Sequence, residues 1–180
     1  GGGYGMFVRL MRNRGFEFYR QDVYCENLFA KYFDIEDLKN QKGFEMLTAY
    51  EVFEHLPNPI EEIEKMLSFS DSILFSTQIQ QSETYKSVDD WWYFTPETGQ
   101  HIALYSLESL NFIADKYELN LYSNGRNYHL LTKKKFVVNP VMIVFYLHKI
   151  IEKILGRHFF NSSSLLDHDM QHVKSILSNK

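Results

Sequence analysis

Residues 44–59 read Phe44-Glu-Met-Leu-Thr-Ala-Tyr-Glu-Val-Phe-Glu-His-Leu-Pro-Asn-Pro59. Residues 44–49 are largely apolar and predict a short buried strand. Two carboxylates and an imidazole follow at spacing i, i+3 and i+4, contributed by Glu51, Glu54 and His55. Because open α/β sheets bind ligands beyond the carboxyl ends of their strands, this stretch predicts an α/β fold with a functional site at the strand end.

If the chain coils after Tyr50, the spacing of Glu51, Glu54 and His55 places their side chains on one helical face. Three interpretations of this face stay open. In the first, the three residues, joined by His101, hold Mg²⁺ that clamps two substrate oxygens. In the second, no metal binds and His55 or His101 is a general base whose tautomer a glutamate fixes. In the third, Glu54 and His55 only satisfy backbone groups.

The composition sets the limits of what the chain can be. Its 180 residues suffice for one α/β domain with a small appendage, and 44% hydrophobic residues exclude a mostly disordered chain. The net charge is −4 and the longest basic block is Lys133 to Lys135, so a nucleic-acid partner is not favoured. One cysteine, Cys25, favours a reducing cytoplasm. No apolar run reaches the roughly 18 residues that cross a bilayer.

The start of the chain resembles a ligand-binding turn. Three glycines alternate there, at Gly1, Gly3 and Gly5. They lead into a helix predicted over residues 6–14, so a ligand could approach the backbone beside the helix N-terminus. Residues 16–19 alternate like a strand that ends near Asp22. An acid roughly 20 residues after a glycine loop is the position that holds ribose hydroxyls in nucleotide-binding folds.

The glycine turn, the strand before Asp22 and residues 44–59 resemble the successive motifs of class I S-adenosylmethionine-dependent methyltransferases. The resemblance implies a Rossmann-like sheet over residues 1–135, mostly parallel with a C-terminal antiparallel hairpin, and S-adenosylmethionine as cofactor. It implies that the glycines border the methionine part, that Asp22 binds the ribose, and that Thr48, Tyr50 and Glu51 line the way to the substrate. It also places the family's first strand upstream of Gly1, so we expect an N-terminally truncated chain.

The segment from residue 78 to residue 101 is too long and too aromatic for a simple connection. It contains a cluster of acidic and aromatic side chains: Asp89, Asp90, Trp91, Trp92, Tyr93 and Phe94. Trp91, Trp92 and Tyr93 suit stacking on a sugar or a planar ring, and a lid that packs on the core is an equal alternative. His101 resembles the histidine that many family members bring to the substrate. It joins Glu54 and His55 as a catalytic candidate.

The second half of the chain predicts helices and a hairpin. Asn58 and Ser106 are candidate caps for helices over residues 59–67 and 107–116. Residues 119–122 and 128–132 read as hairpin strands, and the pair Asn124-Gly125 favours a type I′ turn. Residues 136–180 are predicted to form a C-terminal helical extension. Its helix over residues 141–155 is apolar nearly all round, so it could dock on the domain, form a homodimer or rest on a membrane surface, with the first two favoured.

The predicted function follows from the chemistry that this cofactor leaves to the protein. Because the sulfonium is already activated, the enzyme must align the acceptor, exclude water and remove a proton from a hydroxyl. We expect O-methylation of a sugar or another small polyhydroxylated metabolite. The alternative is a non-catalytic methyltransferase-like interaction domain. A dinucleotide-binding site is disfavoured. Its fingerprint G-x-G-x-x-G has a glycine three positions after the second glycine, and Gly1-x-Gly3-x-Gly5 has none there.

Overall fold

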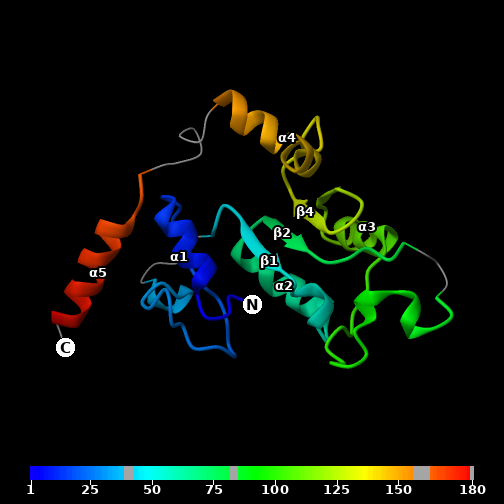
Figure 1. The fold of residues 1–180 in the computed structure, drawn as a ribbon, viewed down its shortest axis with the longest axis horizontal. Helices are drawn as coiled ribbons and strands as arrows, with labels where there is room; N and C mark the ends of the chain where they lie inside the picture. Colours follow the sequence, from blue (N-terminus) through cyan, green and yellow to red (C-terminus); the bar gives the residue numbers. More distant parts are fainter. Residues whose placement is uncertain (39–42, 82–84, 156–162, 179–180) are drawn as a thin grey trace. The chain divides into compact units, whose positions relative to one another are not determined.

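The structure, a computed structural model, describes residues 1–38, 43–81, 85–155 and 163–178. It divides the chain into two compact units, and Figure 1 labels the helices and strands. The first unit comprises residues 1–42 together with residues 149–180, and the second comprises residues 43–148. The domain boundary expected after residue 135 stays a prediction. Among the described residues, no helix has both the length and the apolar character that crossing a bilayer demands.

The second unit is built on a mixed four-stranded sheet. Its strands are β1 (Leu47–Tyr50), β2 (Ser72–Ser76), β3 (Asn120–Ser123) and β4 (Tyr128–Thr132). The order is β1-β2-β4-β3; β1 and β2 are parallel, and β4 is antiparallel to both of its neighbours. The predicted α/β class and C-terminal hairpin are therefore confirmed. In the described chain, however, only one strand pair is parallel, so the sheet is mixed rather than mostly parallel.

One face of this sheet carries the main core. Successive residues of a strand point to opposite faces, so Ile73 and Phe75 share a face, and both are fully buried. Helices α2 (Pro59–Phe69) and α3 (Leu107–Lys116) contribute Ile63 and Leu110 to the same cluster. Phe53 is also fully buried and stacks on Phe75 with ring centroids 4.0 Å apart. This contact fixes the segment that follows β1 against the sheet.

The helices of the second unit begin where local signals place them. The Ser106 hydroxyl accepts a hydrogen bond from the Ser109 N–H at 3.2 Å and caps α3 as predicted. Helix α4 (Pro140–Leu155) begins at a proline, and the Asn139 side chain accepts the N–H of Val141 at 3.0 Å. Helix α2 begins at Pro59, but Asn58 makes no capping hydrogen bond through its side chain. Proline alone presets the first turn there.

Two sequence predictions about strands were wrong. Residues 16–19 form no strand; the neighbouring backbone makes only an isolated bridge between Arg20 and Asp34, so no ladder develops there. Asn124 and Gly125 do not form a two-residue turn, because β3 ends at Ser123 and β4 begins at Tyr128. A four-residue loop joins the strands, and the Asn124 side-chain oxygen accepts the backbone N–H groups of Arg126 and Asn127 in this loop and of Tyr128 at the start of β4.

The first unit joins the two ends of the chain. Helix α1 (Met6–Asn13) follows the glycine turn, and α5 (Leu166–Ser178) packs beside it. Arg12 donates two hydrogen bonds to the Asp169 carboxylate, at 2.9 and 2.7 Å, and both side chains are 2% exposed. Val173 packs against the small core of this unit, which consists of Val8, Ala30 and Phe33. The C-terminal helix is therefore an integral part of the N-terminal unit.

Candidate functional site

The segment after β1 does not form the predicted helical face. Glu51 adopts a left-handed conformation with φ +49°, and the following 3₁₀ helix η2 covers only Phe53–His55. The Glu51 carboxylate accepts a hydrogen bond from the Ser76 hydroxyl at 2.5 Å, and its N–H donates to that hydroxyl at 2.9 Å. Glu51 is thereby tied to the end of β2, away from the face that carries Glu54 and His55. Sequence reasoning missed Ser76, which is the last residue of β2, the strand beside β1.

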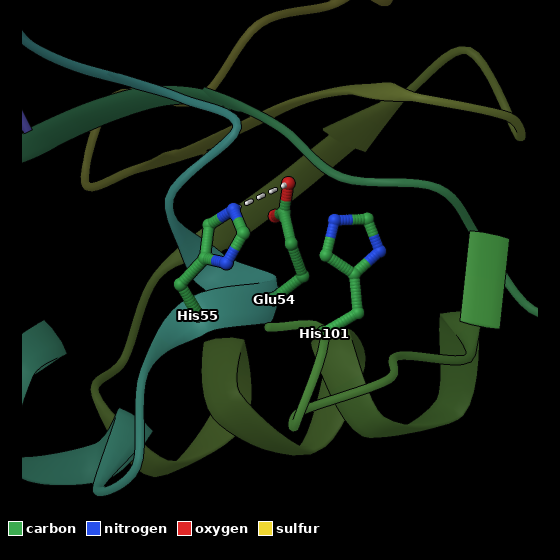
Figure 2. Close-up of side chains that lie close together, drawn as sticks. All are labelled: Glu54, His55 and His101. Atoms are coloured by element: carbon green, nitrogen blue, oxygen red, sulfur yellow. Dashed lines mark ion pairs between the residues drawn. The ribbon is translucent and has the colours of Figure 1, made fainter. Parts of the chain in front are cut away.

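Glu54, His55 and His101 are brought together by backbone hydrogen bonds between two distant segments. The N–H groups of Ile102 and Ala103 both donate to the Glu54 carbonyl, at 2.8 and 3.0 Å. Figure 2 shows the Glu54 carboxylate between the two imidazole rings, whose centroids are 5.0 Å apart. One possible ligand atom from each of the three residues lies within 4.8 Å of the other two. We call these three residues the acceptor cluster.

Both histidines of the acceptor cluster are oriented by backbone carbonyls. His55 Nδ1 lies 2.9 Å from the Gln100 carbonyl oxygen, and His101 Nδ1 lies 2.6 Å from that of Tyr93. A carbonyl oxygen only accepts hydrogen bonds, so Nδ1 carries the hydrogen in each neutral ring. The lone pair is then on Nε2 of both rings. Each ring is fixed in the tautomer that offers Nε2 to a proton or to a metal ion.

The Glu54 carboxylate is the least satisfied polar group of the cluster. Its side chain is fully buried, and within the described residues neither oxygen has a hydrogen-bond partner. The distance from Glu54 Oε1 to His55 Nε2 is 3.9 Å, which exceeds a hydrogen bond. Two imidazole lone pairs and a carboxylate therefore converge, and none of these three residues places a hydrogen-bond donor between them. A buried carboxylate without a partner can be satisfied by a proton or by a metal ion.

Buried tyrosines surround the acceptor cluster. Tyr93 is 1% exposed, its ring lies 4.3 Å from that of His101, and its hydroxyl lies 3.3 Å from Thr77 Oγ1. Burial raises the pKa of Tyr93; the polar interaction of its hydroxyl with Glu54 and the charge of Glu54 add to this, whereas the hydrogen bond with Thr77 opposes it. Burial and the charge of Glu54 raise the pKa of Tyr105 to about 12. Both phenols thus stay neutral donors at physiological pH.

The predicted cofactor residues of the first unit form a connected turn. The Asp22 carboxylate accepts the N–H of Gly3 at 2.9 Å and also those of Tyr24 and Cys25. Burial acts to raise the pKa of Asp22, but these three hydrogen bonds hold it below its usual value. Gly3 has φ +54°, and a Cβ there would meet nothing within 4 Å. Contact of Asp22 with the ribose of a cofactor stays a prediction.

The other two glycines of the turn differ from Gly3. Gly5 has φ +86°, and a Cβ there would lie 2.4 Å from the Asn27 side-chain oxygen. Its lack of a side chain therefore serves packing against Asn27 rather than access for a ligand. Gly1 is exposed at the end of the chain, and its amino group lies 3.4 Å from the Gln21 carbonyl oxygen. Contact of either glycine with the cofactor stays a prediction.

The remaining predicted cofactor residues belong to the second unit. Thr48 and Tyr50 alternate with Ala49 on β1, so they share the sheet face opposite the main core. Tyr50 pairs with Ser76 in register, and Ser76 pairs with Tyr128. Burial, with a smaller effect of Tyr128, raises the pKa of Tyr50. Each unit thus holds its own part of the predicted cofactor site, and the joining of the two parts stays a prediction.

The three predicted substrate residues have different surroundings. Tyr93 is buried in the wall behind His101, so its ring offers no open face to a sugar. Trp91 is partly buried and stacks on Tyr85 with ring centroids 5.3 Å apart. Trp92 is 71% exposed. Of the three, Trp92 is the residue whose ring is open to a ligand.

Comparison with known proteins agrees with this geometry. A family model described as a methyltransferase domain matches residues 1–124. The chain therefore belongs to this methyltransferase-domain family, for which S-adenosylmethionine is the usual methyl donor. No curated protein matches the chain significantly. Membership of this family favours the enzyme over a non-catalytic interaction domain.

Proposed function

We propose that this methyltransferase methylates a hydroxyl oxygen and that the acceptor cluster takes up the proton that the hydroxyl loses. One observation carries the proposal. The buried Glu54 carboxylate and the Nε2 atoms of His55 and His101 converge with no donor among them. Transfer to a thiolate, which has no proton to lose, would not require such a set of proton acceptors.

The chain's own residues account for the steps that a hydroxyl acceptor requires. When bound, S-adenosylmethionine supplies a methyl group that is already activated. As the new C–O bond forms and the C–S bond breaks, the hydroxyl proton passes to Nε2 of a histidine. The Glu54 carboxylate stabilises the resulting imidazolium, because an opposite charge a few ångströms away favours the protonated ring. The backbone carbonyls on Nδ1 keep both rings in position throughout.

A metal ion is the second way to satisfy the acceptor cluster. The candidate ligand set differs from the predicted one in Glu51, whose carboxylate accepts a hydrogen bond from Ser76. The possible ligand atoms of Glu54, His55 and His101 lie within 4.8 Å of one another. Two imidazoles and one carboxylate suit zinc, iron or manganese, whereas Mg²⁺ prefers oxygen ligands. Such an ion would bind the acceptor oxygen and lower the pKa of its hydroxyl.

The proposed acceptor class is a sugar or another small polyhydroxylated metabolite. The support comes from η4 (Trp92–Phe94) and the preceding turn. The Trp92 ring is 71% exposed, and the Asp89 side chain, three positions earlier in the sequence, is exposed too. Exposed aromatic and carboxylate side chains suit the apolar face and the hydroxyl groups of a sugar. Asp90 contributes less, because its carboxylate accepts the N–H groups of Lys86 and Ser87.

The test measures formation of S-adenosylhomocysteine with a panel of polyhydroxylated acceptors. We expect His55→Gln and His101→Gln to lower kcat about 100-fold, the usual contribution of general acid-base catalysis. The matched control is His148→Gln, which changes an exposed histidine of the same unit. Binding of S-adenosylhomocysteine, measured by calorimetry, should be unchanged in all three variants. If His55→Gln and His101→Gln both kept the kcat of the His148→Gln control, that result would contradict the proposal.

The same assay distinguishes deprotonation by a histidine alone from deprotonation assisted by a metal ion. Activity that survives exhaustive chelation assigns deprotonation to the histidines alone. Activity that chelation abolishes and that Zn²⁺ or Mn²⁺ restores assigns a metal to Glu54, His55 and His101. If Mg²⁺ restored activity better than Zn²⁺ and Mn²⁺ do, that result would contradict the inference that two imidazoles and one carboxylate do not suit Mg²⁺.

A further inference from the structure

Exposed apolar side chains concentrate in one short segment of the second unit. We call this segment the apolar ridge; it runs from residue 136 to residue 147 and includes the start of α4, drawn in orange in Figure 1. Its exposed large hydrophobic residues are Phe136, Val137, Val138, Met142, Val144, Phe145, Tyr146 and Leu147. Val144 is 65% exposed and Tyr146 is 55% exposed. A contiguous apolar surface of this kind marks an interaction site.

The apolar ridge is firmly attached to the sheet. The Asn139 side chain donates to the Ser123 carbonyl at 2.8 Å and accepts the first N–H groups of α4. Val141 is buried, and the Phe145 ring lies 5.9 Å from that of Tyr128 on β4. The exposed side chains are therefore held in place by the fold.

The exposed apolar groups surround the helix more than a single contact face requires. Residues 144–147 are consecutive and all exposed, and four consecutive residues cover more than one helical turn. A partner helix covers a single stripe along an amphipathic helix. A lipid surface, in contrast, receives every apolar side chain on the side of the segment that enters it.

The stretch of sequence that contains the apolar ridge carries charge of one sign. Residues 119–151 contain five basic residues, Arg126, Lys133, Lys134, Lys135 and Lys149, and no aspartate or glutamate. Since the whole chain carries −4, the remaining residues together carry −9. Lys133 and Lys134 pair with Asp71 and Glu45 at exposed positions, and exposed pairs of this kind exchange readily for other anions. The ridge therefore adjoins the basic part of an otherwise acidic molecule.

We propose that the apolar ridge docks this methyltransferase on the surface of an anionic lipid bilayer. The apolar side chains would enter the boundary between headgroups and acyl chains, with Phe145 and Tyr146 at interfacial depth. Lys133 to Lys135 would meet the anionic headgroups. Helix α4 has 16 residues, fewer than the roughly 20 that span a bilayer, so it lies in the surface.

The test is co-sedimentation of the full chain with vesicles. We expect binding to vesicles of equal parts phosphatidylcholine and phosphatidylglycerol, little binding to phosphatidylcholine alone, and weaker binding at high salt. The double variant Val144→Asp, Leu147→Asp should lose binding. The matched control is Phe112→Asp on α3, which also places a charge at an exposed apolar position, 67% exposed in this case.

A second variant tests the charge separately. Changing Lys133, Lys134 and Lys135 to glutamine should weaken binding to the anionic vesicles about tenfold or more. Glutamine at Lys31, Lys65 and Lys116 is the control. Circular dichroism and binding of S-adenosylhomocysteine establish that each variant is folded, and the lysine variants leave the apolar contacts intact.

Three outcomes would overturn the proposal. The first is absence of binding to either kind of vesicle. The second is equal binding to both kinds, which would remove the role of the anionic headgroups. The third is a dimer in light scattering that Val144→Asp dissociates, in a chain that vesicles do not bind. That result would assign the ridge to a second copy.

Discussion

Glu54 combines complete burial with the absence of any hydrogen-bond partner among the described residues. We expect Glu54→Gln to be more stable than the unchanged protein by about 1 kcal/mol, because it removes an uncompensated buried charge. The amide of glutamine can also donate to the Nε2 atoms of the neighbouring histidines. Urea unfolding measures the stability, and formation of S-adenosylhomocysteine measures the activity.

The same substitution should lower activity about 100-fold, since it removes the charge that stabilises the imidazolium. Stability and activity would then change in opposite directions, as is common where a site holds an unfavourable group. Glu64→Gln, on α2, serves as the control for loss of one carboxylate. A Glu54→Gln protein less stable than the unchanged protein would show that an unrecognised donor satisfies the carboxylate.

His129 is the residue that should make stability depend on pH near neutrality. It is fully buried, with Nε2 3.0 Å from the Thr77 carbonyl oxygen and Nδ1 2.8 Å from the Ser123 hydroxyl. Burial lowers its pKa, although the hydrogen bond with Thr77 opposes this effect. Below about pH 6.5 the unfolded chain takes up a proton at this residue that the folded chain does not. Its contribution to stability is therefore complete above that pH and is lost as the pH falls.

We expect His129 to lower the free energy of unfolding by about 1 kcal/mol as the pH falls from 7 to 5.5. Urea unfolding at the two pH values measures the difference. In His129→Gln the pH dependence over this range should decrease, whereas in His148→Gln it should persist, because His148 is exposed. An unchanged slope in His129→Gln would assign the pH dependence to other groups.

At the scale of elements, the buried pair of Arg12 and Asp169 joins α1 to α5 across 157 positions of sequence. Burial acts to raise the pKa of Asp169, but Arg12 and Arg9 hold it below its usual value. Asp169→Ala would leave the Arg12 guanidinium buried and unpaired, so we expect a loss of about 3 kcal/mol or more in the free energy of unfolding. Urea unfolding of the full chain measures the loss.

The control lies on the same helix. Asp167→Ala removes an exposed carboxylate two residues away and should change stability by less than about 0.5 kcal/mol. Replacing Arg12 and Asp169 together by methionine should recover much of the loss, since a buried ion pair can often be exchanged for apolar side chains. Equal stability of the two alanine variants would show that α5 does not hold α1.

The elements that sequence predicted well are those whose signals are local. Helix α3 begins at a serine cap, and α4 begins at Asn139-Pro140, because the neighbouring residues alone satisfy the first N–H groups. The strand over residues 16–19 failed because a strand requires a hydrogen-bonded neighbour that its own residues do not specify. The spacing of Glu51, Glu54 and His55 failed as a helical face for the same reason. Ser76, 25 positions away from Glu51, determines where Glu51 lies.

The acceptor cluster was partly predictable. Glu54 and His55 are adjacent in sequence, and their position after an apolar strand indicated a site. That His101 joins them depends on the Glu54 carbonyl, which accepts the N–H groups of Ile102 and Ala103. No pattern within residues 78–101 specifies these hydrogen bonds. Tyr93 is likewise buried beside His101, which its aromatic neighbourhood in the sequence did not indicate.

At the scale of the whole molecule, the predicted cofactor residues come from both units. Asp22 and Gly3 belong to the first, whereas Thr48, Tyr50 and Glu51 belong to the second. If one cofactor contacts both sets, its binding must stabilise both units together by mass action. At a free S-adenosylhomocysteine concentration about 100 times its Kd, we expect about 2.7 kcal/mol of added stability.

Hydrogen exchange with and without S-adenosylhomocysteine tests this expectation segment by segment. The amides of residues 2–5 and 22–25 should exchange more slowly in its presence, and so should those of residues 48–51. The amides of β3 are an internal control, because none of the predicted cofactor residues lies on that strand. Protection confined to the first unit would mean that Thr48, Tyr50 and Glu51 serve the acceptor alone. Protection of both sets would establish that one bound nucleoside joins the glycine turn to the end of β1.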